Sequence, residues 1–337
     1  KKLQTICAEY EIKAQNASLE ATGHGFKIIK EKEGVTVDYD KTVEQLYTYV
    51  TEKWNKKANI KLTATTTVSK PKYTTEDCEK VSNEPMGSYT TEFSVGSSYA
   101  NRNLNIQNGA KLINGAVVYP GEQYSCNENL YPWTEDNGWH PAGTYVDGGV
   151  QDSLGGGICQ VSSTLYNALL RAEIKVVKRF PHSMAVGYVP LSADAALAGD
   201  YKDLVFENDT DAPIYVQGIY NSGGSITFNI YGHDTRKAGH SVKYESKTVK
   251  TTPVKTQTKK DSSKPVGYSE VESSGHVGYV AELWKITYEN GKQVSKELIH
   301  TSTYAMSPTI VVKGTKKAST TTKKDDSDKD DKKSSEK

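Results

Sequence analysis

Three consecutive glycines, Gly155 to Gly157, run directly into a segment that carries a cysteine and has helical periodicity. The apolar residues of that segment recur at a spacing that places them on one buried helix face: Ile158, Val161, Leu165, Ala168, Leu169 and Ala172. Glycine lets the backbone turn tightly and approach a ligand closely. The stretch therefore predicts a tight turn that places Cys159 in the first turn of a packed helix.

A cysteine at this position has the surroundings of a nucleophile. The positive end of the helix dipole lowers the usual thiol pKa of about 8.5. The N–H groups of the turn, including those of Gly156 and Gly157, can hold an oxyanion. His182, in a short loop between extended segments, is the best placed base by sequence. Three other interpretations stay open: a small buried Cys159, an ordinary loop histidine at 182, or zinc held by Cys159, His182 and His140.

Composition narrows the class of protein. A chain of 337 residues has room for two or three domains, and a net charge of +1 argues against a nucleic-acid partner. No apolar run approaches the roughly 18 residues of a membrane span. Because the chain starts at Lys1 rather than methionine, we expect a signal peptide or a membrane anchor upstream. The four cysteines show no C-x-x-C spacing and leave three pairings open, Cys7 with Cys78 among them.

The pattern of segments predicts a multi-domain α+β chain. We expect a small α+β domain over 1–85, with a hairpin that turns at Glu33–Gly34, and a central α+β domain over 86–240, with a helix at 101–113. Residues 241–267 are rich in Lys, Thr and Ser and are interpreted as a linker or a long solvated strand. A small all-β module over 268–315 turns at Asn290–Gly291, and the tail 316–337 is expected to be disordered.

Several segments resemble the VanW domain of bacterial cell-wall-associated proteins. They are "PGEQYS", "DNGWHPA", "GGGICQVSSTLYNALL", "HSMAVGYVP" and "DAAL", in that order over the central domain. Residues 1–85 resemble the peptidoglycan-binding region that often precedes VanW. Residues 268–315 resemble the small extracellular module named for its five glycines, with Gly275, Gly278, Gly291 and Gly314 in its pattern.

The resemblance implies a function, because some clostridial members of this layout have been assigned L,D-transpeptidase activity, which cross-links two diaminopimelate residues of peptidoglycan. The family cysteine is then Cys159 and the family histidine is His182. Backbone N–H groups from Gly157 to Cys159 would stabilise the oxyanion, and Asp194, with Asp152 as its rival, would orient His182. Cys126 stands where family members often have an aromatic residue.

The remaining expectations concern ligands, location and alternatives. We expect the substrate to contact Gly155, Gly156, Gln160, Ser183, Tyr188 and Trp139. The partners would be stem peptides and glycan of peptidoglycan, with no cofactor or metal, for a monomer at the cell surface of a Gram-positive bacterium. One alternative is a non-catalytic wall-binding protein whose aromatic loop, Tyr131 to Trp139, holds glycan. Another is a cysteine amidase or endopeptidase, in which water replaces the acceptor amine. Residues 268–337 are expected to be dispensable for chemistry but not for wall retention.

Overall fold

The computed structural model of the chain describes residues 2–23, 25–57, 61–146 and 149–317, so most of the expected tail lies outside the described residues. The described part is a mixed α+β protein, which confirms the predicted fold class. It divides into two compact units: unit 1 is Lys1–Thr251 with Tyr279–Ala305, and unit 2 is Thr252–Gly278 with Met306–Lys337. Within the described ranges, no helix is both long and apolar enough to cross a bilayer.

The N-terminal part of unit 1 contains short helices and two strand pairs. Its elements are α1 (Lys2–Cys7), η1 (Ala8–Tyr10), β1 (Ser18–Thr22), β2 (Gly25–Ile29), β3 (Gly34–Val37), α2 (Tyr39–Thr48), η2 (Tyr49–Lys53), β4 (Thr66–Ser69) and α3 (Thr75–Glu79). The predicted hairpin across Glu33–Gly34 is wrong, because β2 pairs with β1 whereas β3 pairs with β4. Backbone bonds of Lys32 with Gln15 and of Val35 with Ile12 occupy the expected turn instead.

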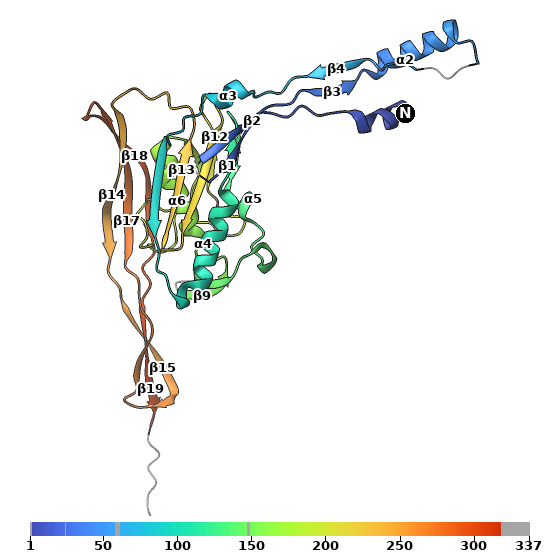
Figure 1. Cartoon of the computed structure of the whole chain (residues 1–337). Helices are drawn as coiled ribbons and strands as arrows, with labels where there is room; N and C mark the ends of the chain where they lie inside the picture. Colours follow the sequence, from blue (N-terminus) through green and yellow to red (C-terminus); the bar gives the residue numbers. More distant parts are fainter. Residues whose placement is uncertain (1, 24, 58–60, 147–148, 318–337) are drawn as a thin grey trace, which may run out of the picture. The chain divides into compact units, whose positions relative to one another are not determined.

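A four-stranded antiparallel sheet forms the centre of unit 1 (Figure 1). Its strands, in order, are β5 (Gly87–Glu92), β13 (Ser225–Tyr231), β12 (Ile214–Asn221) and β6 (Ala116–Val118). Helices α4 (Ala100–Ile113) and α6 (Ile158–Ala172) contact each other and the sheet, α6 over β5 and β13 and α4 over β12. Both helices were predicted, and the six apolar residues expected on the buried face of α6 are all buried.

Short segments connect the larger helices and strands of this part of the chain. They are η3 (Ser97–Tyr99), β7 (Gln123–Ser125), α5 (Cys126–Leu130), η4 (Glu135–Asn137), β8 (Pro141–Val146), β9 (Gly149–Leu154), β10 (Lys175–Lys178) and β11 (Val205–Glu207). The β8–β9 hairpin ends at the glycine turn before α6. Strands β10, β11 and β7 form a three-stranded sheet after it, so α6 is held at both ends by β structure.

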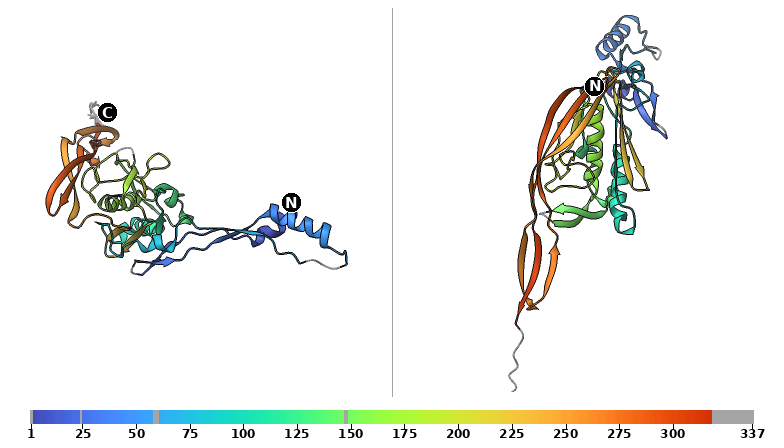
Figure 2. Two further views of the ribbon diagram at one scale, coloured as in Figure 1. Left: turned by 90° about the horizontal axis from the view of Figure 1, so that it is seen from above. Right: turned by 90° about the vertical axis from the view of Figure 1, so that its left-hand side faces the viewer.

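A second sheet covers the other side of α6 (Figure 2). It consists of β14 (His240–Thr252), β17 (Gly278–Glu289) and β18 (Lys292–Tyr304), and Asn290 and Gly291, both with positive φ, form the predicted hairpin turn. The Tyr244 hydroxyl of β14 donates to the Leu170 carbonyl of α6 at 2.7 Å, and Lys285 of β17 pairs with Glu173 at 2.6 Å. Helix α6 is therefore enclosed by sheets on two sides.

Unit 2 is a separate three-stranded sheet in which β19 (Thr309–Lys316) is central. Strand β15 (Thr256–Pro265) pairs with β19 in parallel, and β16 (Ser269–Ser273) pairs with it antiparallel. Residues 241–267, expected as a linker or a long solvated strand, lie mostly in the two solvated strands β14 and β15. Most side chains of these two strands are solvent-exposed, which explains why the sequence of this segment is so polar.

Candidate active site

The three glycines before α6 are required by backbone conformation and by close packing. Gly155 and Gly157 have φ of +83° and +108°, in a region that L side chains rarely adopt. A Cβ on Gly156 would lie 2.5 Å from the Ala142 carbonyl oxygen of β8. The Asn105 side-chain amide of α4 donates to the Gly156 carbonyl at 2.9 Å. The turn is thus fixed against both β8 and α4, and so is the start of α6.

Gly156→Ala is expected to destabilise the fold, because the added methyl group would overlap the main chain of Ala142. Overpacking of this kind costs about 1–3 kcal/mol. The matched control is Gly187→Ala, since a Cβ at Gly187 meets nothing within 4 Å. Calorimetry should give a clearly lower Tm for the Gly156 variant and a nearly unchanged Tm for the control. Equal Tm values for the two variants would contradict the assigned packing.

Polar side chains of α6 hold the loop that faces the cysteine. Ser162 donates to the Ala195 carbonyl at 2.7 Å, and the Ala195 N–H donates to Ser163 Oγ at 2.9 Å. The Asn167 amide donates to the Ala193 carbonyl at 2.7 Å. These side chains are buried, so the side of α6 opposite its apolar stripe is also packed. They fix the main chain on both sides of Asp194.

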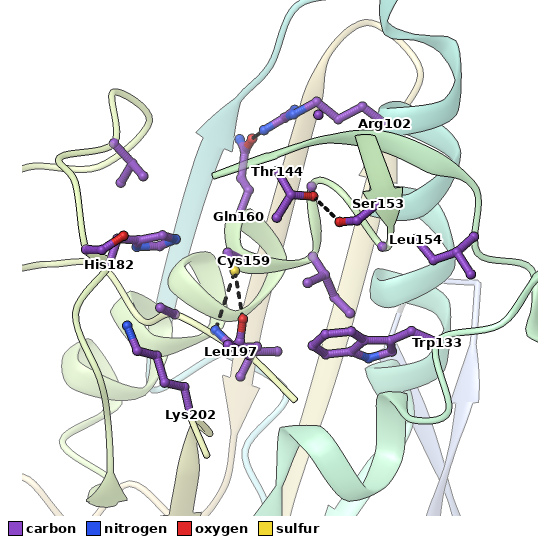
Figure 3. Close-up of a pocket in the computed structure, with 18 of the residues that line it drawn as sticks. Arg102, Trp133, Thr144, Ser153, Leu154, Cys159, Gln160, His182, Leu197 and Lys202 are labelled. Atoms are coloured by element: carbon purple, nitrogen blue, oxygen red, sulfur yellow. Dashed lines mark hydrogen bonds between the residues drawn. The ribbon is translucent and has the colours of Figure 1, made fainter. Parts of the chain in front are cut away.

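Cys159, His182 and Asp194 come together beside this loop (Figure 3 labels the first two). The Cys159 thiol is half-buried, and its Sγ lies 3.4 Å from both the N–H and the carbonyl oxygen of Leu197. The ring of His182 points toward Cys159. His182 Nδ1 lies 2.6 Å from Asp194 Oδ2, and the His182 backbone N–H donates to the same oxygen at 2.7 Å. Asp152, the rival, is exposed on β9.

The electrostatics of the three groups support one another. Burial alone would raise the pKa of the Cys159 thiol, but the hydrogen bond and charge of His182 outweigh it and hold that pKa below its usual value. Burial opposes the charged form of His182 as well, yet Asp194 and the thiolate raise its pKa to about 9. Although buried, Asp194 has a pKa well below its usual range because of His182 and Arg179. At neutral pH the arrangement therefore favours a thiolate beside an imidazolium.

This charge pair predicts the pH dependence of acylation at Cys159. Because the pKa of Cys159 is lowered, the thiolate is expected to be present at pH values where a free thiol is still protonated. Because the pKa of His182 is raised to about 9, the proton needed by the leaving group is lost only above that pH. Stopped-flow acylation rates should rise with pH through the lowered pKa of the thiol and fall above about pH 9. If alkylation of Cys159 depends on pH in the same way as alkylation of glutathione, a free thiol, the thiolate–imidazolium pair is contradicted.

The N–H groups at the start of α6 divide into occupied and available donors. The Ile158 N–H donates to the Gly155 carbonyl at 2.9 Å, so it is not available to an oxyanion. Among the described residues, no partner accepts from the N–H of Gly157 or of Cys159, and both residues line the adjacent cavity. The expected oxyanion donors from Gly157 to Cys159 are therefore reduced to these two.

A cavity of about 520 Å³ opens at Cys159 (Figure 3). The expected site residues that line it are Gly155, Gly157, Cys159, Gln160, His182, Ser183 and Tyr188. The Tyr188 hydroxyl lies 3.3 Å from His182 Nε2. Gly156 is not part of the lining, because it packs against Ala142. Trp139 was expected to contact substrate, but it is fully buried in the core; Trp133 of the same aromatic loop lines the cavity instead.

Two cationic side chains, which sequence reasoning missed, also line the cavity. They are Arg102 of α4 and Lys202, and no Asp or Glu occurs among the described lining residues. Arg102 donates to the Gln160 carboxamide oxygen at 2.7 Å, while the Gln160 amide nitrogen donates to Thr91 and to the Glu92 carbonyl. Gln160 therefore holds Arg102 in place through its side-chain oxygen, while its side-chain NH2 group donates to Thr91 and Glu92. The lining favours a ligand with a carboxylate.

The cysteines and the metal alternative can be placed as well. All four cysteines are described, and each is a free thiol, so Cys7 and Cys78 are not paired. Cys126 is fully buried in α5, where burial raises its pKa well above the usual value, which makes it a poor nucleophile. Over the described ranges, no group of three His, Cys, Asp or Glu side chains could hold a metal ion.

Fold and geometry together define a multi-domain α+β protein with a Cys–His–Asp arrangement at a helix start. Residues 101–231 match the family described as "VanW like protein". Residues 1–59 match the "Putative peptidoglycan binding domain" family, and residues 243–316 match the "G5 domain" family. The G5 match begins inside β14, so it includes the segment that was expected as a linker.

Curated relatives share parts of the chain. An uncharacterized protein of Bacillus subtilis, YoaR, is 37% identical over 164 residues, which are 49% of this chain and 53% of that protein. The vancomycin B-type resistance protein VanW of Enterococcus faecalis is 28% identical over 116 residues, 33% of this chain and 42% of that protein. The chain thus spans about half the length of these relatives or less. An IgA1 protease G5 domain structure is 30% identical over 24% of this chain and 96% of that one, with a TM-score of 0.18.

Proposed function

We propose that this protein is a peptidoglycan L,D-transpeptidase with Cys159 as its nucleophile. The observation that carries the proposal is the Cys159–His182–Asp194 arrangement beside a cavity at a helix start. Such an arrangement supplies a thiolate, a proton carrier and an orienting carboxylate, which are the parts of covalent acyl transfer. Its substrate would be the tetrapeptide stem of peptidoglycan, whose free carboxylates suit the Arg102 and Lys202 side of the cavity.

The proposed reaction has two steps, acylation of Cys159 and transfer of the acyl group to an amine. The Cys159 thiolate attacks the carbonyl carbon of the diaminopimelate residue, a C–S bond forms, and the C–N bond to D-alanine breaks as His182 gives its proton to the leaving amine. The side-chain amine of a second stem then attacks the thioester. A C–N bond forms, the C–S bond breaks, and His182 takes a proton from the amine. The N–H groups of Gly157 and Cys159 stabilise the oxyanion of each step.

The domains on either side of the VanW domain support a cell-wall location. A domain of the peptidoglycan-binding family at the N-terminus would hold the protein on its polymeric substrate and so raise the local substrate concentration. The protein would act as a monomer at the cell surface of a Gram-positive bacterium.

Intact-protein mass spectrometry after mixing with a purified disaccharide tetrapeptide tests the proposal. The expected result is a Cys159 adduct with the mass of the substrate minus D-alanine, followed by cross-linked dimers. If the adduct gives only the free tripeptide and no dimer, the protein hydrolyses the stem peptide instead of transferring it to a second stem. If a folded protein binds peptidoglycan yet gives neither adduct nor product, including with a carbapenem as acylating probe, the protein is a wall-binding protein and the proposal fails.

A further inference from the structure

Strand β18 reaches the candidate catalytic carboxylate from the G5 domain. The Tyr304 hydroxyl donates to Asp194 Oδ1 at 2.5 Å, on the carboxylate oxygen that His182 does not use. Tyr304 and Asp194 are 3% and 1% exposed. We infer that Tyr304 is a positioning residue for the proposed transpeptidase, and that the G5 domain completes the active site of the VanW domain. This inference rests on the proposed function.

The direction of the Tyr304 hydrogen bond is fixed by a second partner. The Ser192 backbone N–H donates to the Tyr304 oxygen at 2.7 Å, so the hydroxyl proton is left to point at Asp194. The non-glycine residue Ser192 has a φ of +68°, a backbone conformation that persists only where the surroundings hold it. Burial raises the pKa of Tyr304, so its hydroxyl keeps the proton it donates. Tyr304 therefore fixes both the carboxylate and the loop that carries it.

Alternate residues of β18 form one continuous contact surface. Side chains at positions i, i+2 and i+4 of a strand lie on one face, which here presents His300, Ser302 and Tyr304. Ser302 Oγ accepts from Arg179 Nη1 at 2.8 Å, and Arg179 Nη2 pairs with Asp194 Oδ1 at 2.6 Å.

His300 extends this surface to α6 and to the loop. It lies 2.8 Å from the Tyr166 hydroxyl of α6 and 3.1 Å from Ser192 Oγ. Immediately after β18, the Ala305 N–H donates to the carbonyl of Ser183, the neighbour of His182. The end of β18 thus contacts the segments that carry His182 and Asp194.

These contacts have a chemical consequence. His182 acts as a base only if Asp194 holds its ring in the tautomer and orientation that face Cys159. A carboxylate held at both oxygens cannot rotate away from the ring, and β18 supplies one of the donors at Oδ1. The earlier expectation that residues after 267 are dispensable for chemistry is replaced here: removal of β18 would free Asp194, even for a soluble substrate.

The test compares Tyr304→Phe with Tyr244→Phe in the full chain. Each variant loses one hydrogen-bonded tyrosine hydroxyl from the same sheet, but the partly buried Tyr244 donates to Leu170 of α6 and does not contact His182 or Asp194. We expect Tyr304→Phe to lower the acylation rate at saturating tetrapeptide by about tenfold, as fits the loss of a hydrogen bond to a charged group. Tyr244→Phe should keep the rate within about twofold, although both variants lower Tm.

Two further readouts require no substrate, so they separate this inference from the proposed function. The first is the alkylation rate of Cys159 by iodoacetamide at pH 7, resolved by peptide mass spectrometry. The second is the far-downfield proton resonance of His182 Nδ1–H, assigned by its loss in His182→Ala. Both should change in Tyr304→Phe and stay unchanged in Tyr244→Phe. The inference is overturned if both variants, with their fold intact, match the wild type in these readouts, or if both change them equally.

Discussion

Cys159→Ala is expected to abolish the acyl adduct and all cross-linked product, because no other described thiol lines the cavity. The fold should survive. The thiol is only half-buried and makes two long contacts of 3.4 Å, so its loss should cost no more than about 1 kcal/mol of unfolding free energy. Intact mass and dimer formation are measured with the tetrapeptide substrate, and circular dichroism checks the fold.

Cys126→Ala is the matched control for this experiment. The Cys126 thiol is fully buried in the core, and its pKa is raised, so it should not take part in acylation. This variant is expected to keep the adduct while losing some stability. Product formation by Cys159→Ala at the wild-type rate would remove the catalytic role of Cys159. Loss of the adduct in a folded Cys126→Ala would point to a second role for α5.

His182→Ala is expected to slow acylation by roughly 100-fold or more, the usual scale for a positioned acid–base group. Without the imidazolium, burial of Cys159 is no longer outweighed, and the thiol pKa rises. Alkylation at pH 7 should therefore slow together with acylation. The Asp194 carboxylate keeps Arg179 and Tyr304 as partners, so the variant is expected to fold.

His233→Ala serves as the control, since His233 bonds to Asp211 and does not line the cavity at Cys159. Its acylation and alkylation rates should equal those of the wild type. If His182→Ala keeps both rates, the proton is carried by another group, and the Tyr188 hydroxyl, 3.3 Å from His182 Nε2, becomes the next candidate.

Features encoded by neighbouring residues could be predicted from the sequence. The glycine run gives an unusual backbone, the apolar repeat gives α6, and Asn290–Gly291 gives the β17–β18 turn, each through residues a few positions apart. Cys159 and His182 were proposed as site residues in the same way, from a thiol at a helix start and a histidine in a short loop. The structure now places both beside one cavity.

Features that depend on distant segments could not be predicted. Tyr304 lies 110 residues from Asp194 in the chain, and nothing near it in the sequence marks it as a partner of a carboxylate. Trp139 is surrounded by polar residues and glycine, a composition typical of an exposed loop, yet it is fully buried in the core. The Lys-rich and Thr-rich stretch before β17 was interpreted as solvated chain because most side chains of β14 and β15 are indeed solvated while their backbones pair.

The buried pair of Arg179 and Asp194 has a consequence for how this site can change over evolutionary time. Their side chains are only 7% and 1% exposed, and loss of Asp194 would leave the buried Arg179 charge without its carboxylate, at about 3–5 kcal/mol. Cys159 carries no such penalty. A lineage that abandons the proposed catalysis can therefore replace the thiol in one step, whereas Asp194 is costly to lose as long as Arg179 remains. Relatives that keep the pair but lack the thiol would then have lost the proposed activity.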